Sequence, residues 1–388
     1  ADDVVVTGAT SVLNLNTTGV LSAINPAGTS SGIFVRSGAV VNLNANDIYG
    51  VANANGLDFI LAGDSGGPAV GVFNTNTFNI ATPRLDLGAI GTGLEGSFAG
   101  TGTISVTSTA TDYLTGVRLF RGTVYANLSG VSAVLKQGMG DVTLYGDNSG
   151  LTGTVAPSRL DSGNLILDYT TNNNSKLPAG VSIDGRGATL TINGSSAANT
   201  SQTVAGLVLS NGGSSTIVVN SGTGRSATLN LGAITRAASV GTVRFEPPVS
   251  GAITTTTANA ATGILGGYDT LKDSTGTYFA RNDGSNNIVA QTYAAASNNV
   301  TAWVTNDHVT DGTTGFTSTL DRASINSLRF DAAGPSTVAM GTNGYLNIAS
   351  GGILQTSNVT GGASSITGAR SANSIRRPST NRSRRTTS

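Results

Sequence analysis

The chain has no cysteine, a single histidine, few aromatic residues and few charges of either sign. The missing cysteines exclude a disulfide framework, a thiolate metal site and an iron–sulfur cluster. A lone His308 excludes a multi-histidine zinc or copper centre. Charged residues make up 11 % of the 388 residues, against ~25 % on average, and no apolar run approaches the ~20 residues of a membrane-spanning helix. We therefore predict no metal site, no bound cofactor and no transmembrane segment.

The abundant residues are small, with 53 glycines among many Thr, Asn, Ser, Ala and Val. They are arranged as short alternating stretches between turn residues. In residues 12–16, Leu13 and Leu15 point one way while Val12, Asn14 and Asn16 point the other. The same pattern recurs in residues 38–44, 187–194, 227–232 and 344–351. Alternation over four to six residues, bounded by Gly or Asn, predicts short β-strands and an all-β fold.

Three features favour a β-solenoid over a β-sandwich. Aromatic residues, at 5 %, are too sparse to fill a wide sandwich core, and the Gly-rich pattern continues without a linker. Asn and Thr recur at strand ends, where stacked coils can form side-chain ladders. We expect coils of ~20–25 residues and about 15 coils in all. A pair of β-sandwiches of ~180 residues each is the alternative fold.

Residues 138–155 carry the sharpest motif. Val142 and Leu144 form one inward face of a strand, glycines stand at the corners, and Asn148 can cap a turn. The segment resembles the autotransporter-associated β-strand repeat, read loosely as G-x-G-x-L-x-L-x-G-x-N-x-x-x-G-x-x-x, with Leu151 where an aromatic residue is expected. Weaker similarity covers residues 95–368. The resemblance implies a right-handed parallel β-helix, displayed on or released from a Gram-negative-type bacterium, and we assign residues 1–368 to it.

The two ends of the chain differ from this body. Residues 369–388 hold six of the 21 basic residues and lose the Gly/Thr alternation. A nucleic-acid or acidic-surface arm, an unfolded tail and a frameshift product are three interpretations of them. No aromatic residue interleaves the arginines, which favours a disordered basic tail without a nucleic-acid partner. At the other end, Ala1-Asp2-Asp3 fits a mature terminus after removal of a signal peptide.

One segment resembles a protease motif. Residues 63–68, Gly-Asp-Ser-Gly-Gly-Pro, match the nucleophile motif of trypsin-like serine proteases. In that family a histidine precedes the serine and activates it, whereas His308 lies far after Ser65. A Ser–Lys dyad would need Lys136 or Lys176 beside Ser65. We interpret the segment as a turn.

Two other polar segments have partial metal-ligand character. Residues 306–312 combine Asp307, His308 and Asp311, but in no established ligand spacing. Residues 282–287 resemble part of a calcium loop that lacks its closing glutamate. We interpret both segments as surface turns.

A polysaccharide-cleaving β-helix enzyme is the alternative function. It would need two or three carboxylates on one face. The densest acidic group contains Asp307, Asp311, Asp321 and Asp331, and the ten-residue spacing of the last three predicts no common face. We assign no catalytic residue and expect no enzyme activity.

The sequence as a whole predicts a secreted or cell-surface β-solenoid with a structural or adhesive role. Its surface would offer Thr, Asn and Ser to glycans or neighbouring cell surfaces through many weak contacts. Self-association end to end, as a filament subunit, is a third hypothesis because an uncapped coil exposes a strand edge.

Overall fold

The computed structural model describes residues 3–18, 32–46, 59–64, 69–88, 95–108, 116–153, 157–237, 240–294, 299–312 and 314–368. Strands account for 51 % of the structure and helix for 1 %, so the fold is all-β. The chain forms two compact units, the first made of Ala1–Ala260 and Ile264–Ala290 and the second of Ala261–Gly263 and Gln291–Ser388. We refer to them as unit 1 and unit 2.

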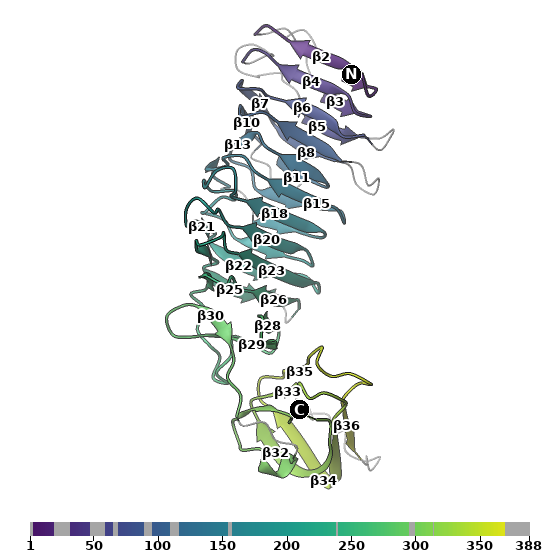
Figure 1. The fold of residues 1–388 in the computed structure, drawn as a ribbon, viewed down its shortest axis with the longest axis vertical. Coiled ribbons are helices and arrows are strands. Elements are labelled where there is room, and N and C mark those ends of the chain that lie inside the picture. Colours follow the sequence, from purple (N-terminus) through teal and green to yellow (C-terminus); the bar gives the residue numbers. More distant parts are fainter. Residues whose placement is uncertain are drawn as a thin grey trace, which may run out of the picture. The chain divides into compact units, whose positions relative to one another are not determined.

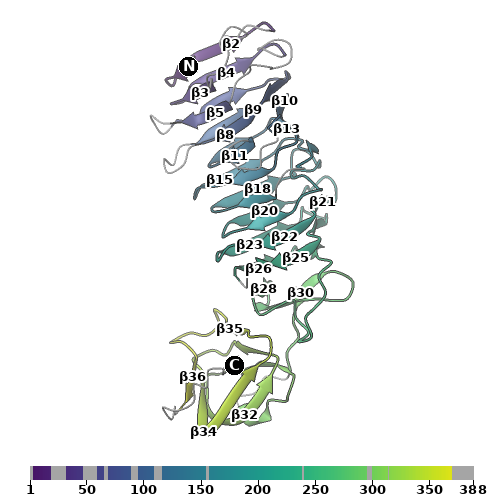
Figure 2. The ribbon, with the colours of Figure 1, turned by 180° about the vertical axis from the view of Figure 1, so that it is seen from behind.

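Unit 1 is a β-solenoid in which successive turns of the chain lie one above another (Figures 1 and 2). Each turn adds a strand to each of two long sheets. Sheet A contains, in spatial order, β1 (Val4–Thr7), β3 (Gly32–Arg36), β5 (Phe59–Asp64), β8 (Arg84–Leu87), β11 (Gly116–Leu119), β14 (Val134–Lys136), β17 (Ser158–Leu160), β19 (Ile183–Gly185), β22 (Gly206–Leu209) and β25 (Ala233–Arg236).

Sheet B runs the length of unit 1 beside sheet A. Its parallel strands are β2 (Val12–Leu15), β4 (Val40–Leu43), β6 (Gly71–Asn74), β9 (Gly96–Ala99), β12 (Gly122–Val124), β15 (Asp141–Leu144), β18 (Asn164–Asp168), β20 (Thr189–Asn193), β23 (Ser214–Asn220), β26 (Thr242–Glu246) and β28 (Asp269–Lys272). It ends in two antiparallel strands, β29 (Thr277–Asn282) and β30 (Ile288–Ala290).

A shorter third side completes the turns. It consists of a sheet of β7 (Ile80–Thr82), β10 (Thr103–Val106), β13 (Asn127–Gly130) and β16 (Gly150–Leu151), and a second sheet of β21 (Thr200–Thr203), β24 (Ala227–Asn230) and β27 (Gly251–Thr254). Strands within each of these sheets pair in parallel.

The predicted β-solenoid is therefore confirmed, and the sandwich alternative is wrong. The sheets of a β-sandwich are antiparallel. Sheets A and B are instead built from parallel strands, one contributed by each successive turn of the chain. The expected coil length was too short, because the chain makes about 12 turns rather than about 15. Residues that face one another in neighbouring turns are typically 24 to 32 positions apart, since most turns include the third side and its loops.

The alternation of apolar and polar residues in the sequence identifies the side chains that form the core. In sheet B one inward column runs from β2 to β23, and its members are paired in register: Leu13, Val41, Phe73, Phe98, Val124, Leu144, Leu167, Ile192 and Val219. All but Leu13 are at most 2 % exposed. Stacking buries each aliphatic side chain between those of the turns above and below, so no turn could bury its face alone.

The motif of residues 138–155 has the local structure expected of it. Val142 and Leu144 of β15 are fully buried, and Leu151 fills a core position of β16. Gly138 has φ +75°, a backbone conformation that favours glycine. Gly146 is required by close approach, because a Cβ there would lie 2.1 Å from the Ala126 carbonyl oxygen.

Unit 2 also stacks parallel strands, around a core of its own. One sheet contains β31 (His308–Thr310), β33 (Ser327–Phe330) and β35 (Ile353–Gln355), and the other contains β32 (Thr317–Ile325), β34 (Thr337–Ile348) and β36 (Ser365–Gly368). A single 3-10 turn, η2 (Val300–Ala302), precedes them. Leu320, Leu328 and Val338 form the centre of this core.

Two sequence predictions lie outside the described residues. These are the turn interpretation of Ser65 to Pro68 and the disordered basic tail at residues 369–388. Within the residues that are described, no helix is long and apolar enough to span a membrane.

Candidate functional site

The candidate site residues named from the sequence make contacts within the fold wherever the structure describes them. His308 lies on β31, where its Nδ1 is 2.8 Å from the Ser327 hydroxyl of the neighbouring turn. Burial lowers the pKa of its imidazole, while the Thr262 backbone and Asp307 oppose that shift. Over the described ranges, no three His, Cys, Asp or Glu side chains gather as a metal site.

The two lysines considered for a dyad are both buried in cages of oxygen atoms. The Lys136 ammonium donates to the carbonyl oxygens of Phe120, Gln137, Gly138 and Ser162 at 2.9–3.3 Å. The Lys176 ammonium donates to the Tyr145 and Gly146 carbonyls, and to Asn172. Burial lowers the pKa of each amine to about 8.

These cages give the lysines a structural role. Each ammonium ties together carbonyl groups that belong to different turns of unit 1. Both ammonium groups are occupied by these donor bonds.

The acidic residues of unit 2 that lie close together in the sequence have different contacts in the structure. Asp311 is buried and accepts hydrogen bonds from the Asp331 and Ala332 amides and from the Ser336 hydroxyl, so it joins neighbouring turns. Asp331 is paired with Arg329 at 3.2 Å, whereas Asp321 lies on β32, in the other sheet. In the 282–287 segment, both oxygens of Asp283 are occupied within its own turn.

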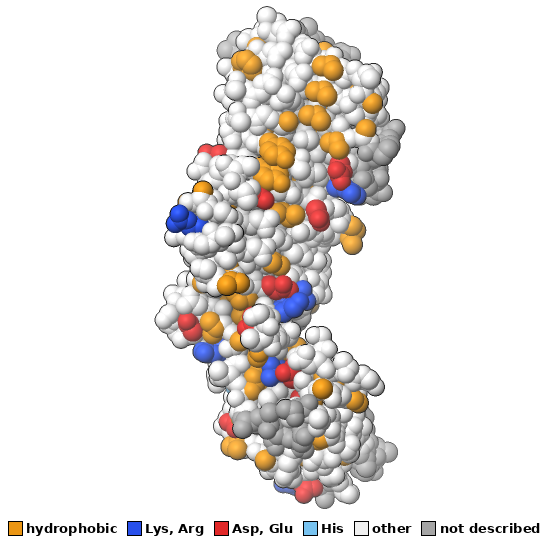
Figure 3. All heavy atoms as spheres, viewed as in Figure 1, with side chains coloured by type: hydrophobic (Ala, Val, Ile, Leu, Met, Phe, Trp, Pro, Cys, Tyr) orange, Lys and Arg blue, Asp and Glu red, His pale blue; other side chains and the backbone are white. Residues whose placement is uncertain are grey.

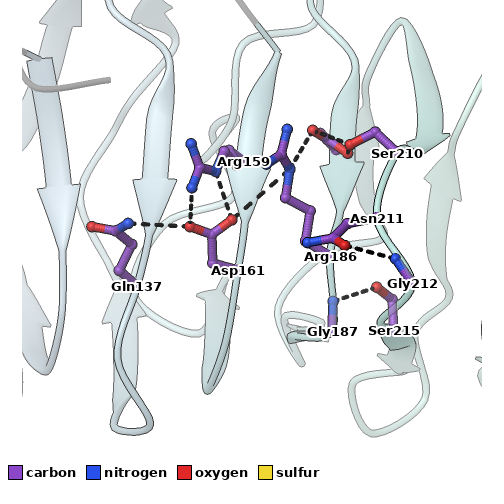
Figure 4. A network of polar contacts seen from close by, with 10 residues as sticks. Gln137, Arg159, Asp161, Arg186, Gly187, Ser210, Asn211, Gly212 and Ser215 are labelled. Carbon is purple, nitrogen blue, oxygen red and sulfur yellow. Dashed lines mark hydrogen bonds and ion pairs between the residues drawn. The ribbon is translucent and has the colours of Figure 1, made fainter. Parts of the chain in front are cut away.

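The outer side of sheet A carries a ladder of ion pairs (Figure 4). Arg159 forms a two-point contact with Asp161, and Gln137 binds the same carboxylate from the preceding turn. Arg186 binds Asp184 at 2.7 Å and reaches Asp161 at 4.0 Å. Each carboxylate is thus neutralised by an arginine, an arrangement that joins turns rather than one that sets up an acid and a base.

The carboxyl end of sheet B carries an uncharged ladder. The Asn42 amide donates to Asn14 at 2.9 Å and the Asn74 amide donates to Asn42 at 3.0 Å. Farther along the same column, Asn220 donates to Asn193 at 3.0 Å. The ladder recurs because the register places these asparagines directly over one another in successive turns.

Two tyrosines interrupt this asparagine ladder. Tyr125 follows β12 and Tyr145 follows β15, and Val124 and Leu144 before them are paired in register. Their rings are stacked with centroids 4.5 Å apart and planes within 3° of parallel. The Tyr125 side is open to solvent, with the residue 44 % exposed. The pair is therefore an aromatic platform on an otherwise polar face.

The surroundings of Tyr145 favour its protonated form. Burial, together with the Asp168 carboxylate and the neighbouring Tyr125, raises the pKa of the Tyr145 phenol. A phenol with a raised pKa stays protonated at neutral pH, and here the Tyr145 side chain is also hydrogen-bonded to that of Tyr125. The backbone below is held by Asn172, whose amide donates to the Tyr145 carbonyl at 2.6 Å.

A row of hydroxyls and a shallow cleft adjoin the platform. Ser97, Thr123 and Thr143 occupy equivalent outward positions of β9, β12 and β15, and Thr123 lies 3.2 Å from the Ser97 hydroxyl. Beyond them is a cleft of about 380 Å³, lined by Glu95, Arg121, Gly122, Thr123, Met139, Gly140, Asp141 and Thr143. Arg121 and Glu95 form an ion pair across it at 2.8 Å.

Together these groups form one continuous area, which we name the β12 surface. It comprises the residues Glu95, Ser97, Arg121, Thr123, Tyr125, Met139, Asp141, Thr143 and Tyr145. The space-filling view shows hydrophobic side chains in small groups along one face of unit 1, among mostly uncharged polar atoms (Figure 3). Aromatic, hydroxyl and charged groups side by side on a rigid sheet are the elements of a ligand-binding surface.

The β12 surface is not among the sites expected from the sequence, although the sequence contains a signal for it. The triplets Thr123-Val124-Tyr125 and Thr143-Leu144-Tyr145 repeat a Thr-aliphatic-Tyr pattern at strand ends. Nothing local in the sequence shows that the two strands are neighbours, because that depends on the length of the turn between them.

Comparisons with known proteins identify no relative. No protein-family model matches the chain, and no curated protein or solved structure matches it.

Proposed function

We propose that the chain is a secreted or cell-surface β-solenoid with a structural and adhesive role and without catalysis. The observation that carries the proposal is the β12 surface, where an open tyrosine pair and a row of hydroxyls lie on a rigid parallel sheet. Tyrosine offers an apolar ring and a polar tip, which suits it to hydroxylated ligands such as glycans.

The rest of unit 1 supports the same role. Neighbouring turns are joined by the asparagine ladders, by the contacts of Gln137 and Arg186 with Asp161 on sheet A, and by the buried lysines. The stack is therefore cross-linked at several levels. Repeated polar side chains on such a stack favour many weak contacts rather than one deep pocket. The resemblance of residues 138–155 to the autotransporter-associated repeat supports export from a Gram-negative-type cell as part of the proposal.

A bead-adhesion assay tests the proposal. Beads coated with the folded chain are mixed with bacterial cells and with immobilised polysaccharides, and beads coated with heat-unfolded chain are the control. We expect adhesion only by the folded chain, decreasing steeply as the coating density is reduced. Equal adhesion of both kinds of bead would refute an adhesive role.

Two measurements complete the test. Assay of the same polysaccharides for reducing ends or unsaturated products separates adhesion from the enzymatic alternative, because a binding protein leaves them intact. Antibody labelling of intact producing cells, before and after protease treatment, tests the surface location.

A further inference from the structure

The residue column at the carboxyl end of sheet B has one small member. Following the register from turn to turn, it contains Asn14, Asn42, Asn74, Ala99, Tyr125, Tyr145, Asp168, Asn193 and Asn220. Long polar or aromatic side chains occupy every position but one. At Ala99, between Asn74 and Tyr125, the side chain is a single methyl group.

The aromatic stack therefore ends beside a gap. The two rings lie 4.5 Å apart, close to the ~4.8 Å spacing between strands, so each ring occupies one level of the ladder. The next level belongs to Ala99, which cannot fill it. Asn74 does not close the space either, because its amide donates away from this level, to Asn42 and to Asn76. One face of the Tyr125 ring therefore points toward the level of Ala99, and the residue is 44 % exposed. We refer to the space above the Ala99 methyl group as the opening.

We infer that this opening binds one pyranose ring of a neutral oligosaccharide, stacked on the free face of Tyr125. The inference rests on the proposed function and names the ligand class of the β12 surface. The C–H groups of a sugar ring pack on an aromatic face, and its hydroxyls need donors and acceptors at the rim. Thr123, Thr143 and the phenol groups supply both within the same surface.

The remaining sugar units extend along β12 toward the cleft. From Tyr125 back to Arg121 is four residues of extended chain, or ~13 Å, which leaves room for a short oligosaccharide rather than one sugar. Arg121 and Glu95 at the far end are held by their mutual ion pair and can donate and accept from fixed positions. Met139, 86 % exposed, provides apolar contact beside them.

The charge of the surface selects neutral sugars. Arg121 is neutralised by Glu95, and Asp141 adds a carboxylate at the cleft. Asp168 lies at the next ladder level beyond Tyr145. A uronic or sialic acid would bring a further negative charge toward these carboxylates without an unpaired arginine to receive it.

The test compares variants that change the opening without removing core residues. Ala99→Asn extends the asparagine ladder into the opening, and Tyr125→Ala removes the stacking face. Tyr345→Ala, which removes a tyrosine of similar exposure from unit 2, is the matched control. The probes are cellotetraose, mannotetraose, chitotetraose and tetragalacturonate, measured by ligand-observed NMR and titration calorimetry. Far-UV circular dichroism verifies that each variant is folded.

We expect at least one neutral tetrasaccharide to bind the wild-type chain. Ala99→Asn and Tyr125→Ala should weaken that binding at least tenfold, while Tyr345→Ala leaves it within twofold. Tetragalacturonate should bind more weakly than the best neutral probe. The inference is overturned if no neutral probe binds, if Ala99→Asn binds as tightly as wild type, or if tetragalacturonate is preferred. If the beads nevertheless adhere in any of these cases, the proposed adhesive function is retained and the contact surface lies elsewhere on the chain.

Discussion

The buried Asn148 offers a sharp test of how the turns are held together. Its side-chain oxygen accepts from the Leu128 amide at 2.9 Å, and its nitrogen donates to the Lys176 carbonyl at 3.3 Å. The residue is fully buried, and its two partners belong to the preceding and following turns. Asn148→Ala removes both bonds and leaves a buried N–H and a buried C=O without these partners.

The expected cost follows from those two groups. Leaving a buried polar group unsatisfied costs ~1–3 kcal/mol, so the loss of both partners should cost about 2–6 kcal/mol of local stability. Because ~1.4 kcal/mol is a factor of ten, amide exchange in residues 127–130 should accelerate by roughly 30-fold or more. Hydrogen-exchange mass spectrometry of that peptide measures the change directly.

Asn220→Ala is the matched control for this experiment. Asn220 is also a ladder asparagine, but its bond to Asn193 is exposed to solvent. Its removal should cost no more than ~0.5 kcal/mol. If Asn148→Ala accelerates exchange no more than Asn220→Ala does, the cross-turn role of Asn148 is refuted.

Three further predictions concern core packing, close approach and pH. Leu144→Asp places a charge between Val124 and Leu167 and should cost more than ~4 kcal/mol, so an unchanged thermal melt would contradict its core position. Gly146→Ala should lower stability by ~1–3 kcal/mol because its Cβ meets a carbonyl oxygen at 2.1 Å, which differential scanning fluorimetry can measure. Burial raises the pKa of Asp269 to about 8. The folded state therefore keeps a proton that the unfolded chain loses near pH ~4, and stability falls as pH rises from ~4 to about 8. Asp269→Asn should remove this part of the pH dependence. If the urea midpoint changes equally between pH 5 and pH 8 in the wild type and in Asp269→Asn, the raised pKa of Asp269 is refuted.

Composition and alternation were sufficient to predict the fold class. The inward positions of Leu15, Val142 and Leu144 follow from a period of two, which is a local property of a strand. The ladders of Asn and Thr were also expected, because identical side chains at strand ends meet whenever turns stack in register. The number of turns was overestimated, since nothing in the alternation shows how many residues the third side and the loops require.

The candidate site could not be predicted in the same way. Tyr125 and Tyr145 stack because one short turn of the chain separates them, and the register places the small side chain of Ala99 at the next level. Lys136 and Asn148 look like surface residues in the sequence, yet the structure buries both against backbone groups of other turns. The sequence by itself determined which face of each strand is apolar, because that depends on neighbours two residues apart. Only the tertiary structure decided which turns lie next to each other, because register depends on turn lengths and on how closely the backbones approach.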